Sequence, residues 1–176
     1  MPIFAPPPGK QFTPAAAGIQ QGVIAKVVDR GIVDGNYKGK PTRKHEIIVI
    51  WQVAEKDEDG QPKQVREYFT LSTDEKANLR KRMINLFGQP APEGFDYEKL
   101  VGTQRNLVLS QYKTKEGRDR AKLDSTAKLT PGQAKLEIVP FEFKEKNDVK
   151  QVQSTQPLSG TAVTAANPID DSDVPF

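Results

Sequence analysis

The stretch that decides the fold is HEIIVIWQVA, residues 45–54, in which Ile, Val and Trp fill most positions. Side chains that are β-branched or aromatic favour a strand over a helix. Trp51 shares its parity with Ile47, whereas Ile48 and Ile50 point to the opposite face. We therefore expect both faces of this strand to be covered, one by the core and the other by a partner or by another part of the chain.

Two further strands are expected on either side of this stretch. Residues 18–29 carry apolar side chains at alternating positions, which predicts a long first strand. Residues 30–44 are rich in Gly and in basic side chains and are interpreted as a loop. After the central strand, Asp-Glu-Asp-Gly at residues 57–60 predicts a tight turn. A third strand then follows at residues 63–71, so the second and third strands should form a hairpin.

A helix is expected after the third strand. Ser72 and Glu75 have the spacing of a capping box, which predicts a helix over residues 73–87 with Gly88 just after its last turn. The helix has an apolar stripe that we interpret as core and not as a cofactor site, made of Leu79, Met83, Leu86 and Phe87.

The second half of the chain completes a recognisable order of elements. A helical turn is expected at residues 95–101, strands at 103–113 and 118–129, and a last apolar piece at 136–143. Three strands, a helix and two strands follow one another in an oligonucleotide-binding fold (OB-fold), a small five-stranded barrel with its helix between strands three and four. The predicted fold class is therefore mainly β, an OB-fold-like barrel followed by a disordered tail with an acidic tip.

The 176 residues divide into three predicted parts. Residues 1–17, rich in Pro and Ala, predict an extended N-terminal arm, and residues 18–146 form the expected OB-fold domain. Residues 147–176 predict a disordered linker and an acidic tip, because residues 151–167 carry no charge and few large apolar groups.

Charge is distributed unevenly along the chain. All 26 Lys and Arg residues lie at or before Lys150, together with 20 of the 23 acidic residues, so this part carries +6 and the remainder carries −3. A basic body favours a polyanionic partner such as nucleic acid, and an acidic end favours a cationic one.

Composition and motifs argue against several classes of site. With no Cys, the chain has no disulfides, thiolate chemistry or Cys-based zinc sites. No apolar run approaches the ~20 residues of a membrane span, and residues 1–8 lack the features of a signal peptide. We therefore expect a cytoplasmic protein that contacts no membrane.

No catalytic or metal motif holds up. Residues 35–42 resemble a phosphate-binding GxxxxGKT loop only superficially, because the glycines are one residue too close and Pro41 interrupts the GKT triplet. Residues 55–60 suggest a calcium loop, but its twelfth position is Arg66 where a bidentate Glu belongs. The single His45 has no Cys to join it. The chain is predicted not to be an enzyme and to hold no cofactor or metal.

What remains is a set of basic residues interleaved with aromatic ones on strands and loops. Proteins hold single-stranded nucleic acid in this way, with cations along the phosphates and rings stacked on bases. The predicted phosphate contacts are Lys26, Arg30, Lys38, Lys40, Arg43, Lys44, Arg66, Lys113, Arg118, Arg120 and Lys122. The predicted stacking residues are Tyr37, Trp51, Tyr68 and Tyr112.

The stacking residues differ in how parity places them. Trp51 has a core position as its alternative, because it shares the parity of Ile47 and Val53. Tyr68 should point outward and its neighbour Phe69 inward.

The last residues, Asp170-Asp171-Ser172-Asp173-Val174-Pro175-Phe176, combine three carboxylates with a stiff Pro and an aromatic ring. Such a peptide suits a basic surface with an apolar pocket. Acidic residues followed by Val-Pro-Phe resemble the C-terminal tip of bacterial single-stranded DNA-binding proteins. The resemblance implies that replication and recombination proteins are recruited by Asp170, Asp171, Asp173, Val174, Pro175 and Phe176.

A second resemblance covers roughly the central half of the chain. Residues 68–72, 79–81, 88 and 94–96 are similar to a group of phage-encoded single-stranded DNA-binding proteins, with residues 50–52 as a weaker match. It implies a protein that coats single-stranded DNA without sequence preference during replication, recombination and repair, in the host cytoplasm. The alternative is a non-catalytic replisome or recombination adaptor whose body binds protein instead of DNA. Either protein could be a homo-oligomer.

Overall fold

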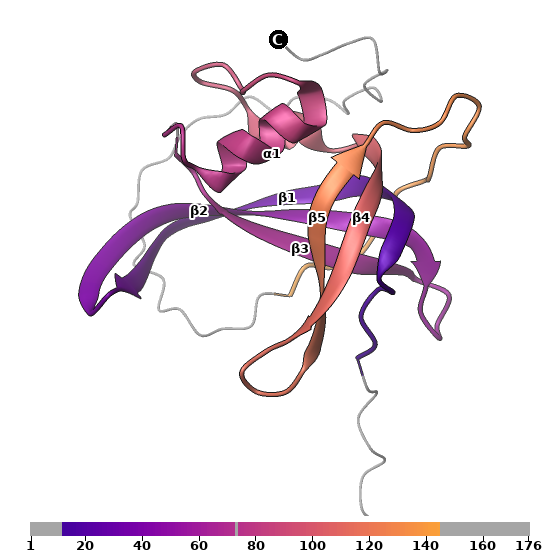
Figure 1. The fold of residues 1–176 in the computed structure, drawn as a ribbon, viewed down its shortest axis with the longest axis horizontal. Coiled ribbons are helices and arrows are strands. Elements are labelled where there is room, and N and C mark those ends of the chain that lie inside the picture. The colour runs from indigo at the N-terminus through magenta and orange to yellow at the C-terminus, as the bar shows by residue number, and fades with distance from the viewer. Residues whose placement is uncertain (1–11, 73, 145–176) are drawn as a thin grey trace, which may run out of the picture.

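A computed structural model describes residues 12–72 and 74–144 of the chain (Figure 1). Its elements are β1 (Gly18–Tyr37), β2 (Lys40–Lys56), β3 (Pro62–Thr70), α1 (Asn78–Phe87), a 3-10 turn (Tyr97–Leu100), β4 (Gln104–Lys113) and β5 (Asp119–Ala127). The predicted order of three strands, a helix, a helical turn and two strands is confirmed. The predicted linker and acidic tip lie outside the described residues, as does most of the N-terminal arm.

The five strands form one antiparallel sheet in the order β3-β2-β1-β4-β5. In Figure 1, β4 and β5 cross the other three strands at a steep angle, so the sheet is strongly twisted. The sheet is not closed, because β3 and β5 stand at its two edges and no ladder joins them in the described part of the chain. The mainly β class is therefore confirmed, whereas a closed barrel is not observed.

The loop expected at residues 30–44 is instead the far end of a long hairpin. The β1–β2 ladder continues through this region to the pair Tyr37↔Lys40. Only Lys38 and Gly39 form the turn, with φ of 50° and 78°. Positive φ at both positions is the requirement of a two-residue hairpin turn that matches strand twist. The prediction was wrong because a glycine such as Gly31, which follows a register shift within the ladder, resembles a loop signal in sequence.

The helix begins later than the capping box predicted. Its first residue is Asn78, and Ala77 at the N-cap position makes no side-chain capping bond. The Ser72 Oγ accepts from the Asp74 amide at 3.2 Å, and Asp74 Oδ1 accepts from the Lys76 amide at 2.8 Å. These side chains therefore close turns ahead of the helix, which is the usual competition between short polar side chains and helical bonds.

The end and the buried face of the helix are as predicted. Gly88 lies at φ 77° and donates its N–H to the carbonyl of Ile84 at 2.8 Å. Leu79, Met83 and Leu86 are buried against one face of the sheet, which we call the inner face. Burial of this stripe holds α1 on the sheet.

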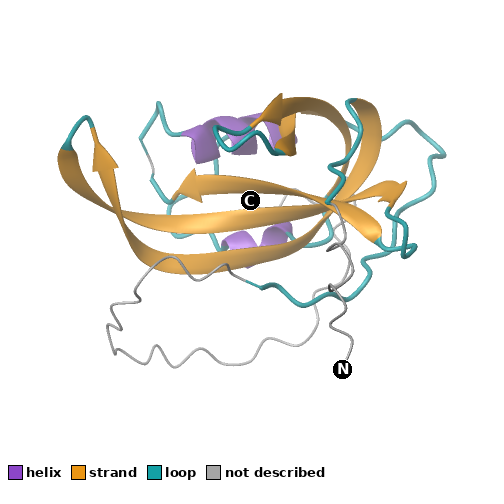
Figure 2. Ribbon diagram, turned by 90° about the horizontal axis from the view of Figure 1, so that it is seen from below, coloured by secondary structure: helices purple, strands orange, loops and turns teal. Residues whose placement is uncertain are grey.

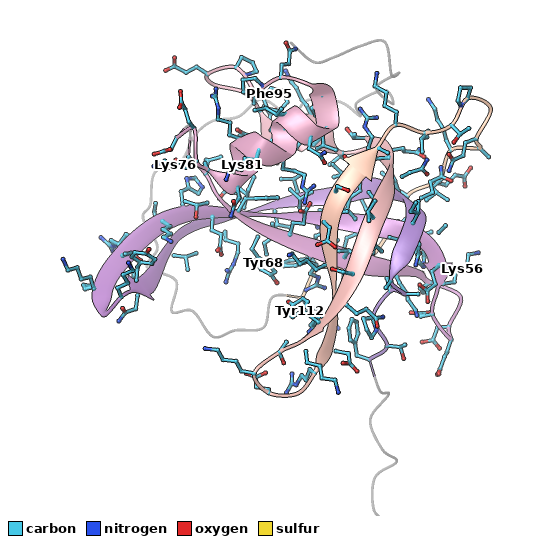
Figure 3. All side chains as sticks on the ribbon, viewed as in Figure 1. Lys56, Tyr68, Lys76, Lys81, Phe95 and Tyr112 are labelled. Atoms are coloured by element: carbon cyan, nitrogen blue, oxygen red, sulfur yellow. The ribbon has the colours of Figure 1, made fainter. Side chains whose placement is uncertain are left out.

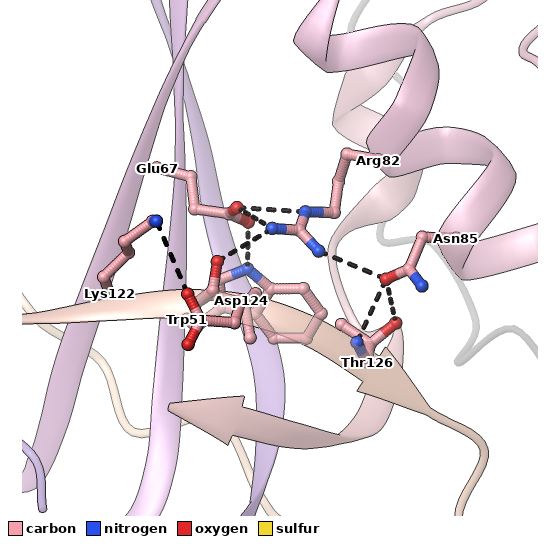
Figure 4. A network of polar contacts seen from close by, with 8 residues as sticks. Trp51, Glu67, Arg82, Asn85, Lys122, Asp124 and Thr126 are labelled. Carbon is pink, nitrogen blue, oxygen red and sulfur yellow. Dashed lines mark hydrogen bonds and ion pairs between the residues drawn. The ribbon is translucent and has the colours of Figure 1, made fainter. Parts of the chain in front are cut away.

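A polar network joins α1 to both edges of the sheet (Figure 4). Arg82 donates to Glu67 Oε1 on β3 at 2.6 and 3.0 Å and to the carbonyl of Leu123 on β5 at 3.1 Å. Trp51 donates its Nε1–H to Glu67 Oε2 at 3.0 Å. Burial raises the pKa of the Glu67 carboxyl above its usual value, and the Arg82 charge and the Trp51 bond oppose this shift only in part. Arg82 thus bridges two strands that have no ladder between them.

The opposite face, which we call the outer face, is covered in part by residues 130–144, named here the strap. The Gln52 amide donates to the carbonyl of Val139 at 2.7 Å and accepts from its N–H at 2.9 Å. Gln104 pairs with Leu136 in the same way, at 3.0 and 2.8 Å. Each Gln side chain therefore pairs with the backbone of the strap as a neighbouring strand would. Figure 2 shows the strap among the teal loop segments, where it leads into the grey trace. The expectation that another part of the chain covers the second face of β2 is confirmed.

Candidate nucleic-acid interface

The outer face gathers several of the predicted contact residues. Ile48 and Ile50 lie on this face, away from the core cluster behind β2. In the strand register, Ile50 stands opposite Lys26 on one side and Arg66 on the other, and Ile48 stands opposite Tyr68. Residues directly opposite one another in an antiparallel ladder point to the same face. Lys26, Arg66 and Tyr68 therefore share the outer face.

Alternation extends this surface onto β4 and β5. Leu107 and Leu109 of β4 point into the core, so Tyr112 points to the outer face. Arg120 stands opposite Tyr112 in the register and therefore shares that face. Lys122, two residues further along β5, follows by the same alternation. In Figure 3, Tyr68 and Tyr112 lie in the angle between the β1–β2 and β4–β5 hairpins.

Four of the predicted cations lie over aromatic rings. Arg30 is 6.0 Å from the ring centroid of Tyr68, and Lys38 is 5.5 Å from that of Tyr37. The other two pairs join Arg66 to Phe143 at 5.1 Å and Arg120 to Phe12 at 5.0 Å. Cations at these distances are attracted by the ring face. The surface therefore alternates positive charge with aromatic rings, of which Phe12, Tyr37 and Tyr68 are exposed.

Sequence reasoning missed Phe12 and Phe143 as members of this surface. Phe12 stands alone in a Pro- and Ala-rich segment, and Phe143 lies in the last apolar piece. Nothing in their neighbourhood along the chain points to a cation, because each ring meets its arginine only through the fold. The arm and the strap thus bring one ring each to the edge of the candidate interface.

The far end of the β1–β2 hairpin holds five more predicted residues, all exposed: Tyr37, Lys38, Lys40, Arg43 and Lys44. Tyr37 keeps 61% of its surface accessible. Lys40 and Lys44 form no ion pair within the described residues, whereas Arg43 pairs with Asp34 at 3.0 Å. An exposed pair of this kind contributes little and leaves the arginine available to a stronger anion.

The second hairpin holds the remaining predicted cations. Lys113 ends β4, and Arg118 lies in the turn before β5. Arg118 lies 4.0 Å from Glu116, and Lys122 lies 3.5 Å from Asp124, with all four side chains largely exposed. Both hairpins therefore present cations at the sides of the outer face.

Trp51 does not belong to this interface. Its side chain is 0% exposed and packs in the core cluster behind β2. The prediction that it stacks on bases is therefore wrong, and the core alternative describes it. Parity with Ile47 and Val53 was the correct signal. Tyr68 is 55% exposed and Phe69 is buried, as parity predicted.

Some outer-face charge is neutralised by the chain itself. Arg30 forms an ion pair with Glu46, and both side chains are largely buried. Lys26 is exposed and makes no ion pair among the residues described. The free positive charge of the candidate interface therefore lies mostly on its lysines.

The described end of the N-terminal arm contacts the Glu55 carboxylate on β2. Glu55 accepts from the amide of Ala16 at 2.7 Å, from Gln20 at 2.9 Å and from Lys63 at 2.5 Å. Burial alone would raise the pKa of the Glu55 carboxyl, but these donors together lower it to about 2. The arm therefore contacts an ionised group on β2.

The described residues give no support to a metal site or to a membrane-spanning helix. In the residues described, no group of three or more His, Asp or Glu side chains is placed to hold a metal ion. None of the helices in the same residues has the length and apolar character that a membrane crossing requires.

No family model matches the chain, and no curated protein matches it at a significant level.

Proposed function

We propose that the protein binds single-stranded DNA without sequence preference on the outer face of its sheet. The observation that carries the proposal is the alternation of cations and rings across this face, with Arg30, Arg66 and Arg120 each over a ring. Phosphates would follow the cations while bases stack on Tyr68 and Tyr112. We further propose that the strand is coated during replication and recombination, and that residues 170–176 recruit partner proteins there.

The fold supports this proposal without requiring a closed barrel. An OB-fold is a partly open five-stranded barrel, and the twisted sheet with α1 between β3 and β4 is compatible with it. The two hairpins extend from the same sheet and flank the outer face (Figure 3). A surface flanked by two basic hairpins suits a flexible polyanion better than a rigid duplex.

The test is a titration of the full chain with fluorescently labelled oligo-dT at several salt concentrations. Binding should weaken steeply with salt, because each phosphate neutralised releases counterions. Replacing Lys26 by Gln should lower the slope of log K against log salt by about 0.7, the value of one lost contact to a single strand. Lys56→Gln is the matched control, since Lys56 is an exposed cation at the end of β2, away from Tyr68 (Figure 3).

Two outcomes would replace the proposal. Binding that is absent, or equally strong at all salt concentrations, would favour the adaptor whose body binds protein. Recruitment is tested separately by deleting residues 170–176, which should leave DNA affinity unchanged or higher while a partner no longer joins the protein on DNA. Loss of DNA affinity in that variant would mean that the acidic segment is part of the DNA site.

A further inference from the structure

A hollow of about 410 Å³ lies beside α1, apart from the outer face. Its walls are formed by Leu71 after β3, by Arg80 on α1 and by the loop that carries Pro92, Phe95 and Tyr97. Phe95 and Tyr97 meet edge to face, with ring centroids 5.2 Å apart. The volume falls in the range of sites that accept small ligands or single side chains. The hollow therefore offers an apolar, aromatic wall with one cation.

Arg80 is the feature that selects the ligand. Within the described residues its guanidinium makes no hydrogen bond or ion pair, although it is partly buried. The nearby carboxylates Asp74 and Asp96 accept from backbone amides at 2.8 and 3.0 Å and so hold turns in place. A partly desolvated arginine beside aromatic rings suits a ligand that joins a carboxylate to an apolar group.

The chain itself contains such a ligand. Residues 170–176 join Asp171 and Asp173 to Val174, Pro175 and Phe176. A Phe ring matches the apolar wall, and Pro175 limits the freedom lost on docking. We infer that this acidic segment docks in the hollow of its own molecule, with the Phe176 ring against Phe95 and Pro92 and a carboxylate on Arg80.

The tether between them is long enough. Phe143, one residue before the end of the described chain, has its ring centroid 5.1 Å from the Arg66 guanidinium on the outer face of β3. Leu71, in the wall of the hollow, is five residues beyond Arg66, or about 17 Å along an extended chain. After Lys144 the chain continues for 32 residues to Phe176, and a flexible chain of that length would span about 30 Å. The segment can therefore reach the hollow of its own molecule.

Docking at this place is compatible with DNA on the outer face. In Figure 3, Phe95, Lys76 and Lys81 lie around α1, whereas Tyr68 and Tyr112 lie between the hairpins. The docked segment would therefore be withheld from other proteins without occupying the DNA site. The inference does not depend on DNA binding, and each can fail alone.

A spin label provides the test, because the chain has no Cys and Ser172→Cys gives a single attachment point. A nitroxide at position 172 should attenuate the amide signals of Leu71, Gly94 and Phe95 in the full chain. Phe176→Ala should abolish the attenuation. Arg80→Gln should lower the docked-to-free ratio by about tenfold, the effect of one charge-assisted bond. Lys81→Gln is the control, since Lys81 is exposed on the same helix and does not line the hollow.

Three results would overturn the inference. The first is that no amide signal is attenuated, and the second is that the attenuation centres on residues 37–44 of the hairpin. The third is that attenuation appears only when labelled chains are mixed with separate isotope-enriched ones. The last result would assign the hollow to the segment of a second copy. An oligo-dT titration of Arg80→Gln separates the two proposals, because unchanged DNA affinity is expected whichever result the spin label gives.

Discussion

The two faces of the sheet are covered by different parts of the chain, through different kinds of contact. The inner face is covered by the apolar stripe of α1, and the largely buried Glu67 on this face is paired with Arg82. The outer face also buries isoleucines, but its cover is the strap, held through the amides of Gln52 and Gln104. Both kinds of cover exclude water, yet only the outer one leaves cations and rings exposed beside it.

The difference shows how one sheet can carry a core on one face and a candidate binding surface on the other. Apolar packing is strong and does not depend on direction, so α1 is held on the sheet without the backbone hydrogen bonds that pair two strands. Amide pairs are directional and fix one register for the strap, which places Phe143 over Arg66. We therefore expect the packing of α1 on the inner face to contribute more to the free energy of unfolding. The amide pairs on the outer face fix the position of the strap.

The inner face should be the most sensitive to a single change. Arg82→Ala leaves the largely buried Glu67 carboxylate without its cation, with only the Trp51 N–H as a donor, so the free energy of unfolding should fall by about 3–5 kcal/mol. Denaturation with urea measures this loss. Lys81→Ala, an exposed change on the same helix, should stay within about 0.5 kcal/mol. If Arg82→Ala costs no more than this control, the bridge does not hold the sheet edges.

The outer cover should respond more weakly and locally. Gln52→Leu keeps the bulk of the side chain but leaves the N–H and C=O of Val139 without partners, at a cost of about 1–3 kcal/mol. Hydrogen exchange of the Val139 and Leu136 amides should speed up while α1 stays protected. Gln61→Leu, an exposed change in the β2–β3 turn, is the control. Equal exchange in both variants would show that the strap does not depend on the amide.

The open part of the outer face should matter for binding and not for stability. Tyr68→Ala should weaken oligo-dT binding by about 1–3 kcal/mol, because one base loses its stacking partner. The unfolding free energy should change little, since the Tyr68 ring is 55% exposed. Tyr68→Phe keeps the ring and should bind like the unchanged protein. A loss in Tyr68→Phe as large as in Tyr68→Ala would assign the contact to the hydroxyl.

The smallest effect is expected where the arm meets the sheet. The folded pKa of Glu55 is about 2, below its ordinary value of 4.5, so its contribution is present above pH 4.5 and is lost as the pH falls towards 2. The exchange rate of the Ala16 amide should rise over that range. In Glu55→Gln the same rate should not show this titration. A rate that rises equally in both proteins would place the effect elsewhere.

The sequence was sufficient for elements whose signal is local. The β-branched run at residues 45–54 predicted β2, and the Gly88 stop predicted the end of α1. Parity placed Tyr68 outward and Phe69 inward. These signals depend on neighbours in the chain, which sequence shows directly.

The rest depends on contacts between distant residues. Residues 30–44 belong to a hairpin whose two strands pair with each other. Gly31 follows a register shift in that ladder, so the sequence there resembled a loop. The Ser72 hydroxyl accepts from the Asp74 amide instead of capping α1, and the spacing of residues in the sequence does not distinguish these two roles. The pairs of Arg66 with Phe143 and of Arg120 with Phe12 join residues 77 and 108 positions apart. Such pairs appear only once the chain is folded.

The bridge made by Arg82 also bears on self-association. Open sheets present two rows of unpaired backbone groups, and such rows are the usual starting point of aggregation between β proteins. Arg82 contacts both edge strands at once, through the Glu67 side chain and the Leu123 carbonyl, and α1 lies with it. Arg82 thereby occupies one backbone acceptor of β5, the Leu123 carbonyl, which is then not available to a strand of another molecule.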